Sequence, residues 1–587
     1  MATDWKQRAQ EKRDSVSALI PKEHLLEKIP SVEEQRDVTG NYIQQFLTDR
    51  EIEITETTAD DIVKRTVRGL WSAVEVTKAF CHRAAIAHQL VNCLHEIFFD
   101  AAIQDAKKLD DYFAEHKKPI GPLHGLPVSL KDQFHVKGVE TTMGYVGWIG
   151  TFQGKTGTGK EKIFESEMVR ELRNLGAILF CKTSVPHTLM AGETANNIIG
   201  YTTNPKNRYL ACGGSSGGEG ALIGLKGSPV GFGTDIGGSI RIPAAFCGLY
   251  GIRPSTGRMP YEGMANSMDG QNSILSVVGP LATSVSSLRL VMKGLLSQEP
   301  WLHDPLVHEI PWRYEQERKI LELTGGIGDA SKVGKLAFGL LKHDGVVAPS
   351  PPVLRALEIV KKSLVDLGHE IIEWKPPSHQ RIVDVGGKTW VFDGGEDVHG
   401  ALGLSGEPPI PQIAVYGDKP VEQVKASDIA AVNVTIRELR KEYMEYWNST
   451  EELTGTGRPI DAVISPVAPF PAARPGKYHY YGYTTFVNLL DYTAVVVPVT
   501  TVNKHVDKID SSFVPGNGID RACYESYDPE IYDGAHVSLQ LVGRRLEEEK
   551  MLAISEHVGS AIEGREQYST AISKFFSELS SLTQRMR

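Results

Sequence analysis

Hydrophobic positions along the chain form two recurring patterns: short continuous apolar runs, and longer stretches in which apolar residues recur every three or four positions. The runs are typical of strands buried on both faces, whereas the stretches predict amphipathic helices. The runs predict strands at 178–181, 230–234, 335–341, 462–464 and 494–499. The stretches predict helices at 165–175, 284–296, 353–367, 427–447 and 546–562. Because the two kinds of element alternate, we expect an α/β fold with helices on both faces of a sheet.

The N-terminal segment, residues 1–55, has the pattern of a helical extension. Asp4 can cap a charged helix that runs to about Leu19, and Pro21 should end it. Farther along, Ser72 and Glu75 have the spacing of a capping box, in which the serine accepts the Glu75 N–H and the glutamate side chain reaches back. A second helical region is therefore expected to begin after Ser72.

Composition limits the class of protein. The chain has 587 residues, of which 41% are hydrophobic and 23% are charged, as in ordinary globular enzymes. The formal net charge of −10 disfavours nucleic acid as the main partner. The N-terminus is too charged for a signal peptide, and no apolar run reaches the roughly 18 residues of a membrane-spanning helix. We therefore expect a cytoplasmic protein that neither spans nor is anchored to a membrane.

The cysteines predict free thiols in a reducing compartment. They are sparse and show no CxxC or other metal-ligand spacing, so no metal site is expected. Cys212 lies beside a glycine-rich segment but has no base near it in sequence, which disfavours it as a nucleophile. The six positions are Cys81, Cys93, Cys181, Cys212, Cys247 and Cys523.

The most unusual composition lies at 213–241, which reads GGSSGGEGALIGLKGSPVGFGTDIGGSIR. Eleven of the residues from 213 to 238 are glycine, the residue that permits positive φ and close backbone approach. Ser215 and Ser239 each follow a Gly-Gly pair and stand 24 positions apart. Such a step can aim backbone N–H groups at one point, which is what an oxyanion hole requires.

Three motifs together resemble those of the amidase signature family. The family's nucleophile would be Ser239 in TDIGGSIR, its second serine, on a cis peptide bond, Ser215 in GGSSGG, and its lysine Lys131 in GLPVSLKD. The motifs occur in the family's order and with its spacing between the serines. The resemblance implies one large domain with a mixed, twisted sheet, and a hydrolase without a cofactor.

The resemblance also implies a proton relay. Lys131 would take a proton from Ser215, Ser215 one from Ser239, and Ser239 would attack the amide carbonyl to form an acyl-enzyme. The implied oxyanion hole consists of the backbone N–H groups of Ile236, Gly237, Gly238 and Ser239.

A lysine can act as a base only when it is neutral. The residues around Lys131 (Leu126, Pro127, Val128 and Leu130) are apolar, so burial should lower its pKa. On local sequence alone, Lys131 could equally be a surface lysine paired with Asp132.

Other residues of these motifs are expected to support the site. Ser216 should hold the backbone, and Asp235 and Arg241 should pair with each other or with the loops around the nucleophile. Met190, Gly214 and Ser215 are the candidate substrate-binding residues.

A first alternative treats 213–217 as the GxSxG nucleophile elbow of α/β-hydrolases, with Ser215 as nucleophile. It needs a strand before the elbow and a histidine base downstream, for which His303, His308, His343, His369 and His536 are available. The strand signal at 209–211 is weak, and Lys131 and Ser239 would have no role.

A second alternative is nucleotide binding by Gly154–Lys160, which matches the first seven positions of a phosphate-binding loop. Glu161 occupies the next position, where Ser or Thr should hold Mg²⁺, and its charge would repel phosphate. The segment is better interpreted as an exposed basic insertion. A third alternative, a non-catalytic subunit, is disfavoured because Lys131, Ser215 and Ser239 are all present.

Longer runs, such as YYGYTTFVNLLDYTAVVVPVT and LQLVGRRL, resemble the acetamidase-type amidases of filamentous fungi. The resemblance extends over about 4–562 and departs at 150–162, which could cover the pocket, and over the last 25 residues.

We expect the amidase signature domain at 56–575, with its catalytic core at about 120–260. The expected reaction releases ammonia from small aliphatic or aryl primary amides, with anilides, carbamates and esters as open alternatives. A small-molecule amide is the expected partner, and a homodimer the expected assembly.

Overall fold

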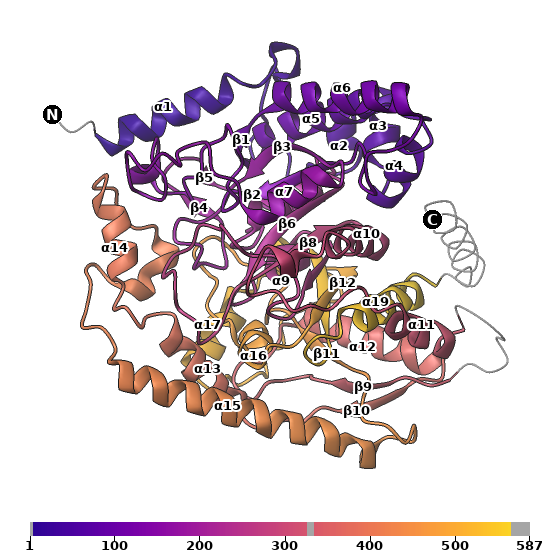
Figure 1. The fold of residues 1–587 in the computed structure, drawn as a ribbon. Coiled ribbons are helices and arrows are strands. Elements are labelled where there is room, and N and C mark those ends of the chain that lie inside the picture. The colour runs from indigo at the N-terminus through magenta and orange to yellow at the C-terminus, as the bar shows by residue number, and fades with distance from the viewer. Residues whose placement is uncertain (1–3, 326–333, 565–587) are drawn as a thin grey trace.

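A computed structural model describes residues 4–325 and 334–564, and its core is one large mixed sheet (Figure 1). Within the described residues, the eleven strands of this sheet pair in the order β1-β3-β2-β6-β8-β7-β12-β13-β11-β9-β10. Parallel pairs lie toward the two edges, where β2 pairs with β3 and β6, and β9 pairs with β10 and β11. The middle of the sheet is antiparallel. The bounds are β1 Leu94–Ile97, β2 Pro127–Lys131, β3 Ile178–Thr183, β6 Val230–Asp235, β7 Tyr250–Arg253, β8 Val277–Ala282, β9 Ala337–Leu340, β10 Glu370–Glu373, β11 Ala462–Pro466, β12 Ala494–Thr501 and β13 His536–Val542.

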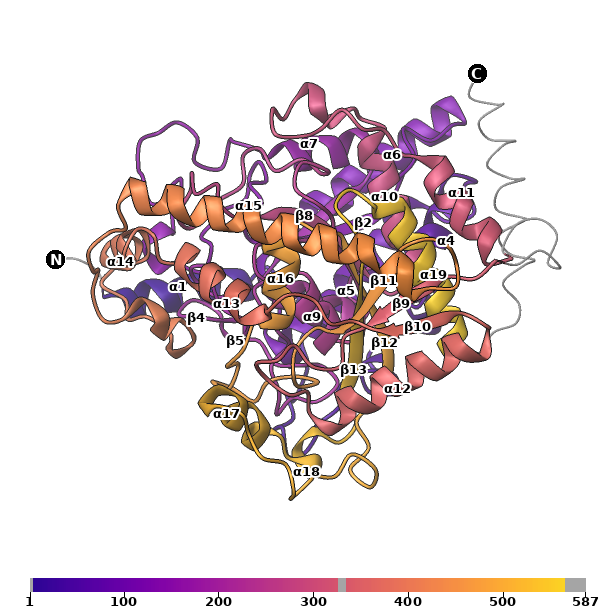
Figure 2. The ribbon, with the colours of Figure 1, turned by 90° about the horizontal axis from the view of Figure 1, so that it is seen from below.

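Helices lie on both sides of this sheet, which confirms the predicted fold class (Figures 1 and 2). Helix α10 packs against β8, α12 against β12 and β13, and α19 against β12, and both α10 and α12 also contact α19. Helix α9 packs against β7, β12 and β13. The bounds are α1 Trp5–Ser17, α2 Asn41–Gln44, α3 Asp49–Thr55, α4 Ala59–Thr66, α5 Ala73–Val91, α6 Phe99–His116, α7 Glu167–Asn174, α8 Gly217–Gly224, α9 Arg241–Phe246, α10 Val285–Leu296, α11 Tyr314–Leu323, α12 Pro351–Asp366, α13 His379–Thr389, α14 Glu396–Gly403, α15 Ala426–Ser449, α16 Gly482–Leu490, α17 Gly518–Ser526, α18 Pro529–Tyr532 and α19 Glu548–Glu563. A short two-stranded sheet, β4 (Ala195–Asn196) with β5 (Gly200–Tyr201), lies apart from the large one.

The five predicted strands and five predicted helices are all present, with ends shifted by a few residues. Strand β2 was not predicted, because Pro127 at its start and Lys131 at its end do not fit the pattern of a continuous apolar run. Strand β13 was missed for a similar reason: its buried Gln540 breaks the apolar pattern. That amide is fully used, since it donates to the carbonyls of Tyr483 and Pro466 and accepts from Arg241. The predicted end of the domain at residue 575 lies outside the described residues.

The N-terminal helix is docked on the domain. Helix α1 begins after Asp4, whose carboxylate accepts the Lys6 N–H, and the chain leaves the helix before Pro21, as predicted. The ammonium group of Lys12, on the buried side of the helix, lies 2.6 Å from Glu96 of β1 and 2.7 Å from Glu140. The extension therefore supplies a cation to the interior of the domain.

The predicted capping box of α5 is only half formed. Ser72 accepts the Glu75 N–H at 3.0 Å, but the Glu75 carboxylate pairs with Arg50 and does not reach back. Asp110 accepts the first backbone N–H groups of the helix in its place. The reciprocal arrangement occurs on α3, between Thr48 and Glu51.

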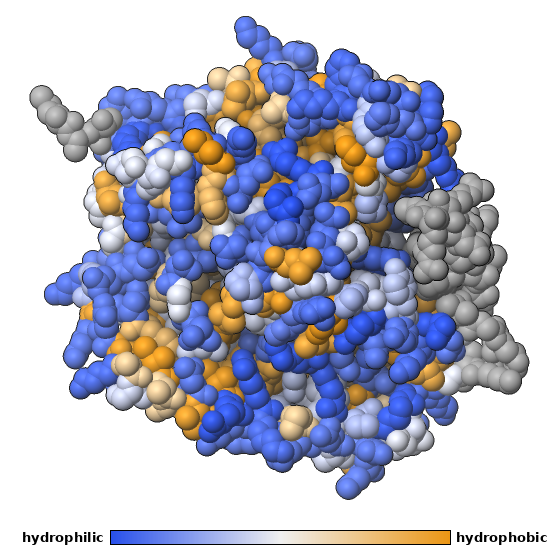
Figure 3. All heavy atoms as spheres, viewed as in Figure 1, coloured by the Kyte–Doolittle hydropathy of each residue, from blue (hydrophilic) through white to orange (hydrophobic). Residues whose placement is uncertain are grey.

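The surface is mainly polar on the face drawn in Figure 3, where apolar residues form small separate patches. Among the described residues, no helix combines the length and the apolar character that crossing a bilayer would require.

Candidate active site

Three segments that are distant in sequence meet at the end of the β2–β6 pair. Lys131 ends β2, and Thr234 and Asp235 end the neighbouring strand β6. The Ser215 loop leads directly into α8, and the Ser239 turn leads from β6 into α9. The two serine segments touch, because the Ser216 N–H donates to the Ser239 carbonyl at 3.1 Å. The structure thus brings together the three residues that the family motifs single out.

Lys131 is fully buried, and its ammonium group is hydrogen-bonded to two hydroxyl groups. Its ammonium nitrogen lies 2.8 Å from the Ser215 hydroxyl and 2.7 Å from the Thr234 hydroxyl. Burial lowers the pKa of Lys131 to about 7, although the carboxylates of Asp235 and Glu219 act in the opposite direction. At neutral pH a substantial share of this lysine is therefore unprotonated and able to accept a proton.

Two close packing contacts shape the Ser215 loop. The peptide bond between Gly214 and Ser215 is cis. A methyl group on Gly214 would lie 2.5 Å from the Ala191 carbonyl, and one on Gly213, whose φ is +89°, would lie 2.8 Å from the Pro243 backbone. Glycine is required at both positions because the chain passes so closely. Ser215 itself is 1% exposed.

The buried carboxylate of Asp235 organises the nucleophile turn. It accepts the Gly238 N–H at 2.8 Å and forms a two-point ion pair with Arg241, with both distances 3.0 Å. The Asn488 amide donates to the same carboxylate at 2.8 Å and accepts from Arg241 at 2.6 Å. Burial alone would raise the pKa of Asp235, but the Arg241 charge and these hydrogen bonds hold it well below its usual range. Asp235 and Arg241 thus pair with each other, one of the two arrangements expected from the sequence.

The Ser239 turn presents backbone donors at the site. Gly238 has a φ of +125°, and its N–H is turned to Asp235. The N–H groups of Ile236, Gly237 and Ser239 have no acceptor among the described residues. Ser239 is 8% exposed, so the turn borders the surface of the site. An oxyanion can therefore find up to three free donors here.

Several residues that the sequence analysis did not assign take part in the site. Thr234 passes the hydrogen bond of Lys131 on to Gln133, whose amide oxygen it contacts at 2.7 Å. The Thr484 hydroxyl donates to the Gly237 carbonyl at 2.7 Å and fixes the turn from α16. Thr234 opens the TDIGGSIR motif and Gln133 directly follows the GLPVSLKD motif, and these positions are the signal that could have identified them.

The predicted substrate-binding residue Met190 follows Thr188 and Leu189, both at positive φ. Its segment reaches the Ser215 loop through the Ala191 carbonyl beside Gly214, and Met190 is half-buried against a second apolar cluster that contains Tyr145. Trp390, which the sequence analysis did not name, stands nearer the turn. A methyl group placed on Gly237 would lie 3.7 Å from its Cζ2 atom.

The two enzymatic alternatives do not fit this geometry. The hydrogen bond on the Ser215 hydroxyl comes from Lys131, and residues 209–211 form no named strand. The glycines of 154–160 lie on an exposed loop, and α7 begins only at Glu167. Glu161 turns its carboxylate back onto the Thr158 N–H, so this loop is not a phosphate cradle. Instead, Lys160 lies over the rings of Phe152 and Phe164.

One buried group of acids resembles a metal site in composition. His95, Glu96 and Asp132 lie close enough to share an ion. The Lys182 ammonium, however, lies 2.8 Å from Asp132, and that of Lys12 lies 2.6 Å from Glu96. Because the carboxylates are already neutralised by ammonium groups, this group does not fit a metal ion.

The thiol of Cys212 is buried and donates to the Thr202 carbonyl at 3.2 Å. Burial raises the pKa of this thiol well above its ordinary value. It is therefore held as the unreactive thiol, in keeping with the interpretation from sequence.

Comparison with known proteins gives a consistent result. The amidase family profile matches residues 75–552. The chain is 44% identical to an acetamidase of Emericella nidulans and 45% identical to an acetamidase of Aspergillus oryzae; each match covers 96% of this chain and 99% of the relative. Among solved structures, a fatty acid amide hydrolase superposes with a TM-score of 0.86 at 32% identity, covering 95% of both chains. The chain therefore belongs to the amidase signature family and is an amide hydrolase.

Proposed function

We propose that the enzyme cleaves amides with Ser239 as nucleophile and with Ser215 and Lys131 as its proton relay. The observation that carries this proposal is the buried contact of 2.8 Å between the Lys131 nitrogen and the Ser215 hydroxyl. A serine hydroxyl becomes a competent nucleophile only when a neighbouring base takes its proton. Lys131, whose pKa burial lowers to about 7, is the base that lies closest to hand.

In the first half-reaction, neutral Lys131 accepts the Ser215 proton while Ser215 accepts the Ser239 proton. The Ser239 oxygen then bonds to the amide carbon, and the carbonyl oxygen becomes an oxyanion held by the free N–H groups of the turn. The C–N bond breaks as the relay returns a proton through Ser215 to the leaving nitrogen. Ammonia departs, and an ester to Ser239 remains.

In the second half-reaction, water attacks the ester carbon and gives its proton to the same relay. The tetrahedral intermediate collapses, the relay returns the proton to Ser239, and the product leaves as the carboxylic acid, which loses its remaining proton to solvent. Gly238 would not hold the oxyanion directly, because its N–H serves Asp235. Fixed donors of this kind are typically worth about 3–4 kcal/mol of barrier each.

We propose small aliphatic primary amides as the preferred substrates. The relatives with 44–45% identity over nearly the whole chain are named acetamidases, which supports a short acyl group. The indole of Trp390 near Gly237 supports the same choice, because it limits the space beside the turn. Met190 and Gly214 complete the proposed binding surface. Aryl amides, anilides, carbamates and esters could use the same acyl-enzyme chemistry, and pocket shape would decide among them.

Ammonia release from acetamide, butyramide, hexanamide, benzamide and phenylacetamide tests this function, with Ser239→Ala as the control. Turnover that is highest for the shortest acyl groups and lost in the variant is the expected result. A folded enzyme that releases no ammonia from any of the five would contradict the substrate proposal, and assays with acetanilide and phenyl acetate would then show whether the acyl-transfer chemistry itself is present.

A cytoplasmic homodimer is the proposed working form. The six cysteines are all unpaired and buried, which supports a reducing compartment. Light scattering after size-exclusion chromatography tests the assembly, because a mass near the 64.5 kDa of one chain would contradict it.

A further inference from the structure

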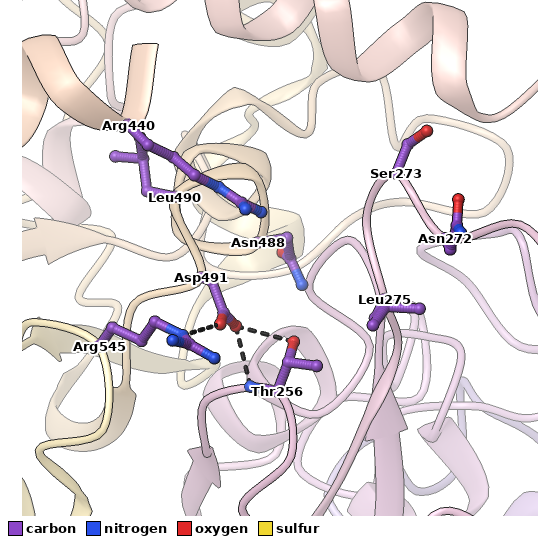
Figure 4. A pocket seen from close by; sticks show the side chains of 9 residues that line it. All are labelled: Thr256, Asn272, Ser273, Leu275, Arg440, Asn488, Leu490, Asp491 and Arg545. Atoms are coloured by element: carbon purple, nitrogen blue, oxygen red, sulfur yellow. Dashed lines mark hydrogen bonds and ion pairs between the residues drawn. The ribbon is translucent and has the colours of Figure 1, made fainter. Parts of the chain in front are cut away.

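A cavity of about 380 Å³ lies at the C-terminal end of α16, where Asn488, Leu490 and Asp491 line it (Figure 4). Its walls come from segments distant in sequence: Thr256 after β7, the 272–275 segment before β8, Arg440 of α15, and Arg545 between β13 and α19. Asn488 forms part of the floor, but both ends of its amide are already used by Asp235 and Arg241. The volume suits a small molecule rather than a polymer.

The charges around this cavity do not balance. Three guanidinium groups, those of Arg253, Arg440 and Arg545, surround a single carboxylate, that of Asp491. Arg253 lies 2.9 Å and Arg545 2.6 Å from Asp491. Among the residues that line the cavity, Asp491 is the only acid. Because Arg253 does not itself line the cavity, the lining carries an excess of one positive charge, from Arg440 and Arg545 against Asp491.

Asp491 accepts no hydrogen bond from Arg440. One of its oxygens takes the Arg253 donor and both the N–H and the hydroxyl of Thr256, and the other takes Arg545. Arg440 donates its Nε to the Leu489 carbonyl at 2.7 Å, while its two terminal nitrogens have no acceptor among the described residues. Partial burial lowers the pKa of Arg440, the charge of Asp491 acts in the opposite direction, and the like charges of Arg545 and Arg253 lower it further. The residue as a whole remains exposed to solvent.

The donors left over match an oxyanion. Figure 4 shows the guanidinium of Arg440 directed into the space between Asn488 and the 272–275 segment. Asn272, on the opposite wall, has no hydrogen bond within the described residues and offers an amide donor. A planar guanidinium with two free donor edges recognises carboxylate and phosphate groups by paired hydrogen bonds.

We propose that this cavity binds a small oxyanion, a carboxylate or a phosphate, on Arg440, with Arg545 supplying a second positive charge. The site is separate from the Ser239 turn, so the proposal does not depend on the amidase mechanism. Arg440 and Arg545 are exposed, so the bound anion would replace water on the terminal nitrogens of Arg440 and would offset the repulsion among the three guanidinium groups.

The test titrates the full-length enzyme with sodium acetate in one series and sodium phosphate in another, at constant ionic strength maintained with NaCl. The melting temperature and isothermal titration calorimetry report binding. We compare the wild type with Arg440→Gln and with Arg437→Gln, a matched control one turn earlier on the same helix that does not line this cavity. We expect saturable binding of at least one anion, weakened at least tenfold by Arg440→Gln and unchanged by Arg437→Gln. The series that saturates identifies the chemical source.

No saturation in either series, or equal weakening in the two arginine variants, would overturn the proposal. Asn272→Ala provides a second test that does not disturb α15, because Asn272 is exposed. It should weaken the same anion severalfold, and wild-type affinity in this variant together with wild-type affinity in Arg440→Gln would refute the site. Should Arg440→Gln not fold, Asn272→Ala alone decides between these outcomes.

Discussion

The hydroxyl of Ser129 donates a hydrogen bond of 2.6 Å to Glu219, a fully buried carboxylate. Ser129 lies two positions before Lys131 on β2, so the two side chains point to the same side of the sheet. The second oxygen of Glu219 accepts from Thr183 at 2.8 Å. Glu219 therefore places a titratable acid beneath the lysine, with only neutral hydroxyls as its donors.

This arrangement predicts a pH effect of Glu219→Gln. The Glu219 charge raises the pKa of Lys131 against the larger effect of burial, so its removal should lower that pKa further. Burial raises the pKa of Glu219 itself to about 7, so its charge acts on Lys131 once it ionises near that pH. Because the base must be neutral, the acidic limb of kcat/KM should move to lower pH in the variant. Glu171→Gln, which changes another buried acid on α7, is the control and should leave the limb in place. A Glu219→Gln enzyme with lower kcat but an unshifted limb would contradict the coupling.

Replacement of the nucleophile should separate catalysis from folding. Ser239→Ala is expected to reduce amide turnover at least about 10³-fold, because no acyl-enzyme can form. The melting temperature should stay within about 2 °C of the wild type, since the hydroxyl is not buried in a hydrogen-bond network that holds the fold. Ammonia release and thermal unfolding measure the two effects. Ser228→Ala, a buried serine on the approach to β6, should retain full turnover.

Burial of Lys131 should lower the free energy of unfolding at pH values below the ordinary pKa of lysine. The pKa of Lys131 is about 7 in the folded chain and 10.5 in a free lysine, so between these values the unfolded state binds more protons. Stability should therefore rise with pH through this window, by up to about 1.4 kcal/mol per unit from this group. Urea unfolding at pH 7 and pH 9 measures it, with Lys131→Met as the reference. If the difference between wild type and variant is the same at both pH values, the lysine is not depressed as the structure indicates.

The ion pair under the nucleophile turn should be essential to the fold. Asp235→Asn leaves the Arg241 guanidinium buried without a counter-charge, which typically costs about 3–5 kcal/mol. Equilibrium urea unfolding measures the loss. Asp461→Asn, whose partner Arg458 is 39% exposed, is the control and should cost about 1 kcal/mol or less. Equal losses in the two variants would show that the burial of the Asp235 pair does not matter.

Trp390 should limit the acyl chain. Trp390→Ala is expected to raise kcat/KM for hexanamide relative to acetamide by about tenfold, because an added methylene in an apolar pocket is worth about 1–3 kcal/mol. Trp71→Ala, which removes an indole held by Arg50 and Arg65, is the control and should not change this ratio. An unchanged ratio in Trp390→Ala would place the acyl pocket elsewhere.

Five of the eleven strands of the large sheet could be predicted from the sequence because they are continuous apolar runs, and the long helices could be predicted because they are amphipathic. Strands β1, β2, β7, β8, β10 and β13 were not predicted. The motifs around Lys131, Ser215 and Ser239 pointed to one site because their glycines and serines are so unusual in combination. Strands β2 and β13 were missed because a buried Lys131 and a buried Gln540 look like surface residues in a pattern of hydrophobicity. Only the fold shows that each has its polar partners inside.

The contacts of the pocket were harder to predict. Trp390 and Thr484 lie more than 140 positions from Ser239 in sequence, and neither belongs to a periodic pattern that points at the turn. The prediction of a complete capping box at Ser72 failed for a related reason, because Arg50, which is distant in sequence, pairs with the Glu75 carboxylate. The partners of polar side chains that are distant in sequence therefore could not be predicted from local sequence patterns.

The contact of Lys12 with Glu96 has a consequence for truncation of the N-terminal helix α1. Glu96 is buried on β1, the edge strand next to β3, and Lys182 of β3 neutralises the Asp132 that follows Lys131. Removal of helix α1 would leave the carboxylates of Glu96 and Glu140 without their shared cation, and Glu96 lies two strands away from Lys131 in the sheet. The amino-terminal helix thus supplies a cation to the interior of the domain, and we expect its removal to change the pH dependence of the enzyme's stability.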